Sequence, residues 1–167
     1  MDLTGPPTLA ALGYLYQGDY SIPLRAMEEL RREGLEVLDL SLGAFKAASL
    51  LQHVSPSILV ILTAERRGKR ELRLYRPGGV VSPFSTWMEI STSVKAYYMD
   101  VDTFLKVSRS LGVLPDLTLV LECEVERDEG MELSQWGKEC LRMMKEKAME
   151  LLRDTSVIST TPLRDLE

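Results

Sequence analysis

The stretch SILVILTA, residues 57–64, decides the fold, because it is a continuous apolar run with the length of one strand. Such a run is typical of a strand buried on both faces of a sheet. Two shorter apolar runs, TLAALGYL at 8–15 and LEVLDL at 35–40, precede it, and apolar residues at helical spacing lie between the three runs. The order strand, helix, strand, helix, strand predicts a parallel sheet with right-handed crossovers.

Capping residues bound the two helices predicted between these strands. Asp19 and Ser21 offer N-cap oxygens to the first helix, which ends at Gly34. We therefore predict that Asp19 is a helix cap rather than a ligand. The second helix is predicted from Gly43 to about His53, where a cation interacts favourably with the carbonyl end of a helix. This position gives the single histidine a structural role.

The pattern changes after the central strand. ELRLYR at 71–76 alternates, Pro-Gly-Gly follows at 77–79, and FSTWMEI at 84–90 has the composition of another strand, so we predict a hairpin here. A helix that begins at Asp100 or Asp102 then leads to the strand LTLVLECEV, and a long amphipathic helix starts at Ser134. The predicted fold is a three-layer α/β/α sandwich whose sheet is mostly parallel.

Length and composition predict one domain and exclude several partners. The 167 residues suit a single α/β domain at 1–153, with about five main strands, followed by a tail at 154–167 that we predict to be flexible. The formal net charge of -5 argues against nucleic acid and anionic lipid as partners. No apolar run reaches the roughly 20 residues that span a bilayer, and no basic-then-apolar leader is present, which favours a cytoplasmic protein.

Three further features have structural interpretations. Cys123 and Cys140 show no CxxC spacing and are predicted to be reduced, buried thiols. Gly13 and Gly18 precede a helix but do not form a GxGxxG or Walker loop, so they predict no phosphate cradle. The basic segment at 65–76 is predicted to be an exposed charge run that serves solubility and edge protection, although an acidic partner would also fit it.

The order of these elements and several local motifs resemble the nickel-iron hydrogenase maturation endopeptidases, which remove a C-terminal peptide from the hydrogenase large subunit. GYLYQGDYSIP at 13–23, followed by AMEEL at 26–30, is similar to the family motif G-N-x-L-x-x-D-[DE]-G-x-G and its helix V-x-E-x-L. VLDLSLGA at 37–44 is similar to V-x-x-x-D-x-G-T-x-G. The resemblance extends from Thr8 to about Arg153 and implies the fold of that family.

The same resemblance implies that the metal ligands of the family are replaced. Tyr20 stands where the first motif has its acidic ligand, and Thr63-Ala64 stands where the central strand of the family ends in Asp-Ala. The position of the family histidine, counted back from Leu111-Gly112, falls on Tyr97. Because divalent metals in such sites take carboxylate and imidazole donors, we predict neither a bound metal nor a cofactor.

The first functional hypothesis is therefore a noncatalytic or altered relative of the family. It would bind a hydrogenase large subunit or a related maturation partner through the crevice where the metal would lie. The candidate crevice residues are Asp19, Tyr20, Asp39, Thr63, Glu65 and Tyr97.

Two alternatives stay open at this stage. One is an active C-terminal processing endopeptidase with an unconventional metal site built from Asp19, Asp39 or Glu65. The other is an unrelated small-molecule-binding or nucleotide-binding α/β protein of the same layered architecture. It would use the Gly18 loop and the basic segment at 65–76.

Overall fold

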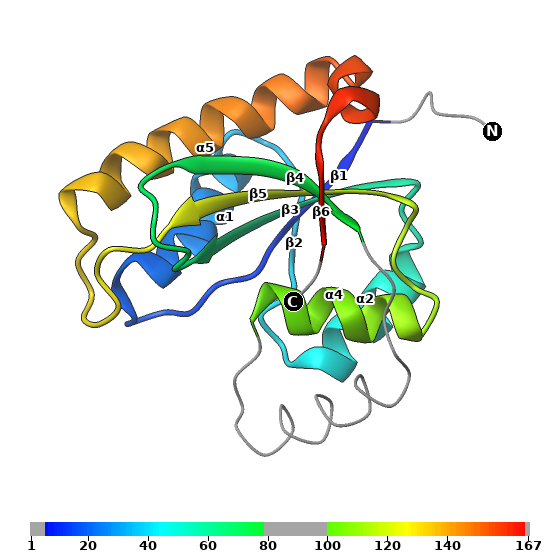
Figure 1. Cartoon of the computed structure of the whole chain (residues 1–167), viewed down its shortest axis with the longest axis horizontal. Helices are drawn as coiled ribbons and strands as arrows, with labels where there is room; N and C mark the ends of the chain where they lie inside the picture. Colours follow the sequence, from blue (N-terminus) through cyan, green and yellow to red (C-terminus); the bar gives the residue numbers. More distant parts are fainter. Residues whose placement is uncertain (1–5, 79–99, 166–167) are drawn as a thin grey trace.

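The computed structural model describes residues 6–78 and 100–165. Within them, six strands form one sheet in the order β2-β1-β3-β5-β4-β6 (Figure 1). The central neighbours β1, β2, β3 and β5 are parallel, whereas β4 runs antiparallel to β5. The predicted mostly parallel sheet is thereby confirmed. The strands are β1 Thr8–Ala11, β2 Val37–Asp39, β3 Ile58–Glu65, β4 Leu72–Gly78, β5 Leu117–Glu124 and β6 Leu163–Asp165.

Helices cover both faces of the sheet, as a three-layer sandwich requires. α1 and α5 pack together on one face, and α2 and α4 pack together on the other (Figure 1). Each pair closes a separate apolar core against the sheet. The helices are α1 Ile22–Arg32, α2 Ala44–Val54, α4 Val101–Ser110 and α5 Gln135–Arg153, and the 3-10 helices are η1 Gly18–Ser21 and η2 Ser156–Thr160.

Strand alternation decides which face each side chain of β3 joins. Leu62 and Ala64 belong to the core under α1 and α5, whereas Leu59 and Ile61 belong to the core under α2 and α4. Successive side chains of a strand point to opposite faces. Thr63 and Glu65 at the end of β3 therefore point to the same side of the sheet as the core under α2 and α4. Glu122 and Glu124 at the end of β5 point to that side too.

The predicted strand at 71–76 is present as β4. β4 pairs with β5 in the register Arg73↔Glu122 and Tyr75↔Val120. A strand that comes later in the chain thus lies between β3 and β4. The predicted hairpin partner at 84–90 lies outside the described residues.

Two predicted caps are confirmed and one is wrong. Asp100 accepts a hydrogen bond from Thr103 N–H at the start of α4, and Ser134 accepts one from Gly137 N–H at the start of α5. Asp19 does not cap α1, since Ser21 is the N-cap residue and makes no side-chain capping bond. The Asp19 side chain turns instead toward the start of α5. His53 lies in the last turn of α2, as predicted.

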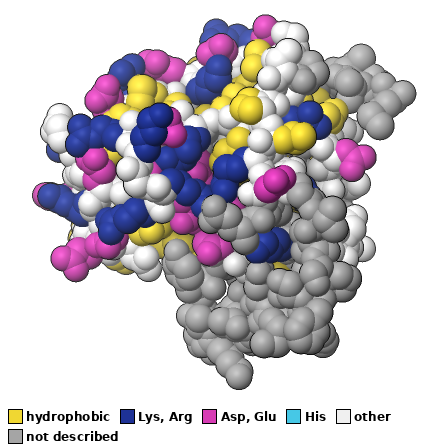
Figure 2. Space-filling model, in the orientation of Figure 1, with side chains coloured by type: hydrophobic (Ala, Val, Ile, Leu, Met, Phe, Trp, Pro, Cys, Tyr) yellow, Lys and Arg dark blue, Asp and Glu magenta, His cyan; other side chains and the backbone are white. Residues whose placement is uncertain are grey.

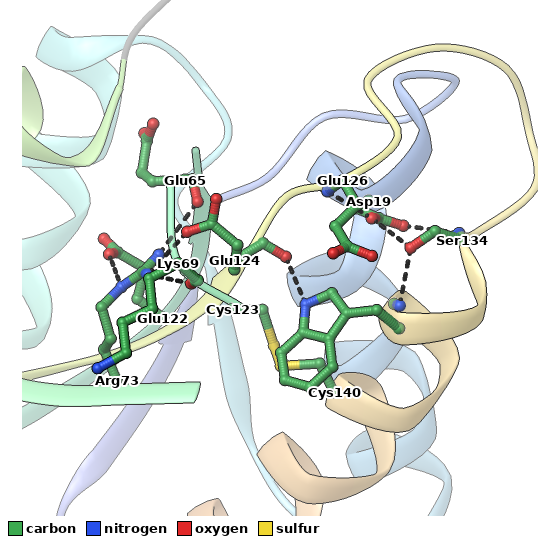
Figure 3. The surroundings of a disulfide bond; sticks show 12 residues. Asp19, Glu65, Lys69, Arg73, Glu122, Cys123, Glu124, Glu126, Ser134 and Cys140 are labelled. Carbon is green, nitrogen blue, oxygen red and sulfur yellow. Dashed lines mark hydrogen bonds and ion pairs between the residues drawn. A yellow bond between two sulfur atoms is a disulfide. The ribbon is translucent and has the colours of Figure 1, made fainter. Parts of the chain in front are cut away.

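The prediction of two reduced thiols is wrong, because Cys123 and Cys140 form a disulfide between β5 and α5 (Figure 3). Both residues are fully buried, as predicted. Cys123 faces α5 through the strand alternation described above, and the two Cα atoms are 6.1 Å apart. That separation lies in the ordinary range for disulfides, a constraint that spacing along the chain does not reveal.

Reduction of this disulfide should destabilise the protein. The bond closes a loop with a sequence separation of 17 residues. A loop of this length corresponds to a stabilisation of about 3 kcal/mol through the unfolded chain. Urea unfolding with and without dithiothreitol should show a loss of about this size. The double substitution of both cysteines by alanine should remove the difference between the two conditions, and equal stability of the oxidised and reduced wild type would contradict the prediction.

The tail at 154–167 contains regular structure in its described part. η2 follows α5, and β6 pairs with β4 in parallel from Leu163 to Asp165. The mobility of the tail stays a prediction. In the part of the chain that the structure describes, no helix is both long enough and apolar enough to cross a membrane.

Candidate functional site

The carboxyl ends of the parallel strands β1, β2, β3 and β5 meet along one edge of the sheet, which we call the carboxyl edge. Doubly wound folds bind their ligands at this place. Asp39 is the last residue of β2, and Thr63 and Glu65 lie at the end of β3. Tyr20 lies in η1, which contacts β3. The fold thus brings four of the predicted crevice residues to the carboxyl edge.

A buried carboxylate, Glu122, occupies the end of β5 at this edge and is fully enclosed. It accepts hydrogen bonds from Arg67 Nε and Nη2, both at 3.0 Å, and from Arg73 Nε at 2.7 Å. The Tyr75 hydroxyl donates a fourth bond at 3.0 Å. The side chain of Glu122 is 0% exposed, and those of Arg67 and Arg73 are only 21% and 13% exposed. Such charges are tolerated inside a protein when they are paired and hydrogen-bonded.

The contacts of Glu122 extend into a larger network. Arg73 Nη1 also lies 2.8 Å from Glu124, Arg67 Nη1 lies 3.0 Å from Asp102, and Arg164 Nη2 lies 3.0 Å from Asp102. Three arginines therefore face three carboxylates, and the charge is balanced. We call this set the buried ion network: Arg67, Arg73, Arg164, Asp102, Glu122 and Glu124.

The contacts of the network favour the charged forms of Arg67 and Glu124. Burial by itself would lower the pKa of Arg67, but its hydrogen bonds to Glu122 and Asp102 raise that pKa well above the ordinary value. Burial would raise the pKa of Glu124, but bonds from Arg73 and the nearby backbone lower it instead. Burial and the Glu122 charge both raise the pKa of Tyr75, which stays a neutral donor. Each carboxylate of the network is thus engaged with a cation.

The prediction that the basic segment at 65–76 is a solvated charge run is wrong for two of its residues. Arg73 turns inward because it lies opposite Glu122 in the β4–β5 register, and Arg67 reaches the same carboxylate from the connection between β3 and β4. Arg66, Lys69 and Arg70 are exposed, as predicted. Figure 2 shows basic and acidic side chains interspersed on this face of the molecule rather than a field of one sign.

Glu65 ends β3, and among the described residues its carboxylate forms no ion pair with an arginine. Its Oε1 accepts a single long bond, 3.3 Å, from Val101 N–H at the start of α4. Burial is the main cause that raises the pKa of Glu65 to about 7, with Asp100 adding to the effect. The pKa of Tyr20 is also raised, first by burial and then by the nearby Glu65 charge. Tyr20 and Glu65 therefore interact electrostatically at the carboxyl edge, and Thr63 is buried on β3 two positions before Glu65.

The substitution Glu65→Gln should stabilise the protein in alkaline solution. Between the ordinary pKa of 4.5 and the folded value of about 7, the folded state holds a proton that the unfolded state has lost. Stability conferred on the wild type by that proton therefore falls as pH rises through this window. The variant should unfold at a higher urea concentration than wild type at about pH 8 and at a similar one at about pH 4.

A suitable control for this measurement is Glu36→Gln, which changes an exposed glutamate outside the carboxyl edge. It should leave both midpoints unchanged. A Glu65→Gln variant that differs from wild type equally at both pH values would show that the effect does not arise from ionisation of Glu65.

Asp19 lies on the other side of the disulfide from Glu122 and Arg73 (Figure 3). Its Oδ2 accepts bonds from the backbone N–H groups of Glu126 and Arg127 and from the Ser134 hydroxyl, and its Oδ1 accepts one from Ser134 N–H, all at 2.6–3.0 Å. Burial would raise the pKa of Asp19, but these four bonds lower it. Gly137 approaches so closely that an added Cβ would collide with the carboxylate. Asp19 therefore clamps the loop 126–134 and the start of α5.

Asp39 and Tyr97 complete the predicted set. The Asp39 carboxylate accepts a bond from Ser41 N–H at 2.8 Å, and the Ser41 hydroxyl in turn accepts one from Gly13 N–H at 3.0 Å. Asp39 thus shapes the loop that follows β2 beside the end of β1. Tyr97 lies outside the described residues, so its predicted place in the crevice stays a prediction.

Several solved structures superimpose on most of this chain. The hydrogenase maturating endopeptidase HybD from E. coli covers 90% of it with a TM-score of 0.61 and 14% sequence identity, over 94% of its own length. The [NiFe] hydrogenase maturation proteases HycI and HybD from Thermococcus kodakarensis cover 90% and 87% of it, over 96% and 99% of their own lengths. Their TM-scores are 0.60 and 0.58, and their identities are 15% and 22%. The chain has the fold of the nickel-iron hydrogenase maturation proteases. No family model and no curated protein sequence matches the chain.

The maturation protease fold raises the question of whether these residues suit a metal ion. Two of the positions at which the resemblance implies family ligands carry the hydroxyl groups of Tyr20 and Thr63, which are poor donors for a divalent cation while they keep their protons. Among residues 6–78 and 100–165, no three His, Cys, Asp or Glu side chains are grouped to hold a metal. The buried carboxylates closest to the edge, Glu122 and Glu124, are bonded to arginines. The described residues do not fit a metal site of the carboxylate and imidazole type.

Sequence reasoning missed Glu122 and Glu124, although a signal was present. Both stand at alternate positions in LTLVLECEV, an otherwise apolar run typical of a buried strand. Acids that are buried in a strand require cations on the neighbouring strand. Arg73 and its neighbours in the alternating segment ELRLYR are suitable in spacing, so the pairing of these two segments could have been inferred.

Proposed function

We propose that this protein binds a protein partner at the carboxyl edge and does not cleave it through a bound metal. The observation that carries the proposal is the buried ion network, in which Glu122 and Glu124 at the end of β5 form ion pairs with arginines and are not free to bind a metal. Hydroxyl groups at Tyr20 and Thr63 support it further. Since the solved neighbours are hydrogenase maturation proteases, the partner we propose is a hydrogenase large subunit or a related maturation protein.

Exposed apolar side chains beside the carboxyl edge support a docking role. Leu15 and Tyr16, in the loop after β1, are 59% and 67% exposed, and Met131, in the loop after β5, is 67% exposed. The two loops are joined by backbone bonds, including one from Gly130 N–H to the Tyr16 carbonyl at 3.1 Å. Exposed apolar residues that gather in one place are typical of protein-binding surfaces.

The direct test uses a purified hydrogenase large subunit that keeps its C-terminal extension. We expect a complex in size-exclusion chromatography and an unchanged subunit mass after incubation with added nickel or zinc. The double substitution Tyr16→Ser with Met131→Ser should weaken the complex at least about tenfold, since two exposed anchors are lost. Leu111→Ser, which changes an exposed apolar residue at the far end of α4, should leave it unchanged.

Metal analysis of the protein purified without chelator provides the decisive contrast with an active peptidase. A stoichiometric transition metal, together with shortening of the large subunit, would contradict the proposal and favour the unconventional processing endopeptidase. Metal-free protein that also fails to bind the large subunit would refute the proposed partner.

A further inference from the structure

The last strand of the chain is held on the sheet by few backbone contacts. β6 has three residues, and Arg76 N–H of β4 donates to the carbonyl of Pro162 just before it, at 2.9 Å. Leu163 and Asp165 are exposed. A strand this short at the edge of a sheet gains little from pairing alone. Side chains must hold the tail in place: Ile158 anchors η2 in the core under α1 and α5, and β6 needs an anchor of its own.

The Arg164 side chain supplies that anchor. Its Nη2 lies 3.0 and 3.3 Å from the two carboxylate oxygens of Asp102, and its guanidinium group lies 4.7 Å from the centre of the Tyr75 ring. An arginine that is paired with a carboxylate and stacked on an aromatic ring makes two favourable contacts at once. We call the Asp102 carboxylate, the Tyr75 ring and the β4 edge at Arg76 the arginine socket.

Residues other than those of the tail hold the arginine socket in shape. The Tyr75 hydroxyl donates to Glu122 at 3.0 Å, and Asp102 is held by Arg67. The end of β4 is also fixed, because Arg109 of α4 donates to the Pro77 carbonyl at 2.9 Å. These contacts do not involve β6, so the socket does not depend on the tail for its geometry.

We infer that the arginine socket is a docking site for an extended partner segment that presents an arginine, and that the chain's own tail occupies this site until the partner displaces it. The seated tail defines the chemistry of the guest: an extended backbone beside Arg76 and an arginine that reaches Asp102. Addition of a strand to an open sheet edge is a common mode of peptide recognition.

Charge balance favours a cationic guest. When Arg164 leaves, three carboxylates of the buried ion network face the two remaining arginines, Arg67 and Arg73. An incoming arginine restores the balance in surroundings of low dielectric constant, where an unpaired charge is costly. The inference shares the buried ion network with the proposed function but uses none of the candidate crevice residues, and its test needs no hydrogenase subunit, so a failure of one can be distinguished from a failure of the other.

A peptide of residues 158–165, ISTTPLRD, carries the arginine in its native context and serves as the probe. We expect the full-length Arg164→Ala variant to bind the labelled peptide at least about tenfold more tightly than wild type, whose tethered tail competes at a high effective concentration. A peptide with alanine in place of the arginine should not bind. Addition of Asp102→Asn to the variant should weaken binding at least about tenfold, because the charged acceptor is lost. Arg153→Ala, an exposed arginine at the end of α5, should behave as wild type.

Other outcomes would overturn the inference. Equal binding of both peptides, or no binding by a folded Arg164→Ala variant, would show that the socket does not read an arginine. A wild-type dimer that is lost on Arg164→Ala would assign the edge to the tail of a second copy instead of a partner. If the variant does not fold, hydrogen exchange of the wild-type backbone amides at 163–165 tests the inference instead. The peptide with arginine should accelerate this exchange, because it displaces β6. Equal exchange rates with both peptides would refute the inference.

Discussion

Substitution of Glu122 by glutamine should lower the free energy of unfolding by about 3–5 kcal/mol, the usual cost of removing one partner from a buried ion pair. The side chain keeps its size but loses its charge, while Arg67 and Arg73 stay buried opposite it. Glutamine also directs two N–H donors toward a site where the neighbours are donors, including the Tyr75 hydroxyl. Urea unfolding followed by circular dichroism measures the loss.

The matched control for this prediction is Glu126→Gln, in the strand-to-helix loop that follows β5. Its carboxylate pairs with Arg70 Nε at 2.7 Å, but the Arg70 side chain is 63% exposed. Solvent screening limits such a pair to about 1 kcal/mol or less. A similar loss for both variants would mean that the buried position of Glu122 confers no special stability.

Substitution of Asp19 by alanine should cost about 4 kcal/mol or more, because several buried donors each lose a charged acceptor. Three backbone N–H groups, from Glu126, Arg127 and Ser134, would have no carboxylate partner. The start of α5 would also lose the anion that interacts favourably with its N-terminus. We therefore expect the loop after β5 to lose hydrogen-exchange protection before the central strands do.

Acid unfolding of the wild type gives an independent view of Asp19. Its folded pKa lies below the ordinary value of 3.8, so its stabilisation is present above about pH 4 and is lost as pH falls through the folded pKa. The Asp19→Ala variant should lack this acid-dependent component. Asp128→Ala, which removes an exposed acid of the same loop, should keep it. Parallel acid-unfolding curves for wild type and Asp19→Ala would contradict the assignment.

Local patterns were sufficient to predict most elements of the fold. The run at 57–64 corresponds to β3 at Ile58–Glu65, and the helix predicted from Ser134 corresponds to α5 at Gln135–Arg153. The first strand is shorter than the predicted 8–15, since β1 ends at Ala11 and the apolar residues beyond it enter a loop. Apolar periodicity identifies what is buried, but it does not specify where backbone pairing stops.

Long-range partners could not be predicted in the same way. Arg67 and Glu122 are 55 positions apart, and the disulfide joins residues whose proximity depends on the packing of α5 against β5. The local pattern predicts that Asp19 caps the nearest helix, although its partners lie 107–115 positions further along the chain. A side chain of a type that often caps the nearest helix can instead form its hydrogen bonds at the start of a distant helix once the chain has folded.

At the candidate site, the resemblance located positions better than roles. It directed attention to Tyr20, Thr63 and Glu65, and the structure places all three at or beside the end of β3. It did not indicate that arginines would occupy the neighbouring acids, because those arginines come from the β3–β4 connection and from β4. Their inward direction depends on the pairing of β4 with β5.

The position of β5 between β3 and β4 also constrains how the protein forms during synthesis. Residues 58–78 leave the ribosome before residues 117–124, yet β3 and β4 do not pair with one another and need β5 between them. Until β5 is inserted, both β3 and β4 present unpaired edges, which are prone to aggregation. A nascent chain that stalls before residue 124 therefore cannot complete the sheet. Protection by a chaperone would matter most between the synthesis of β4 and that of β5.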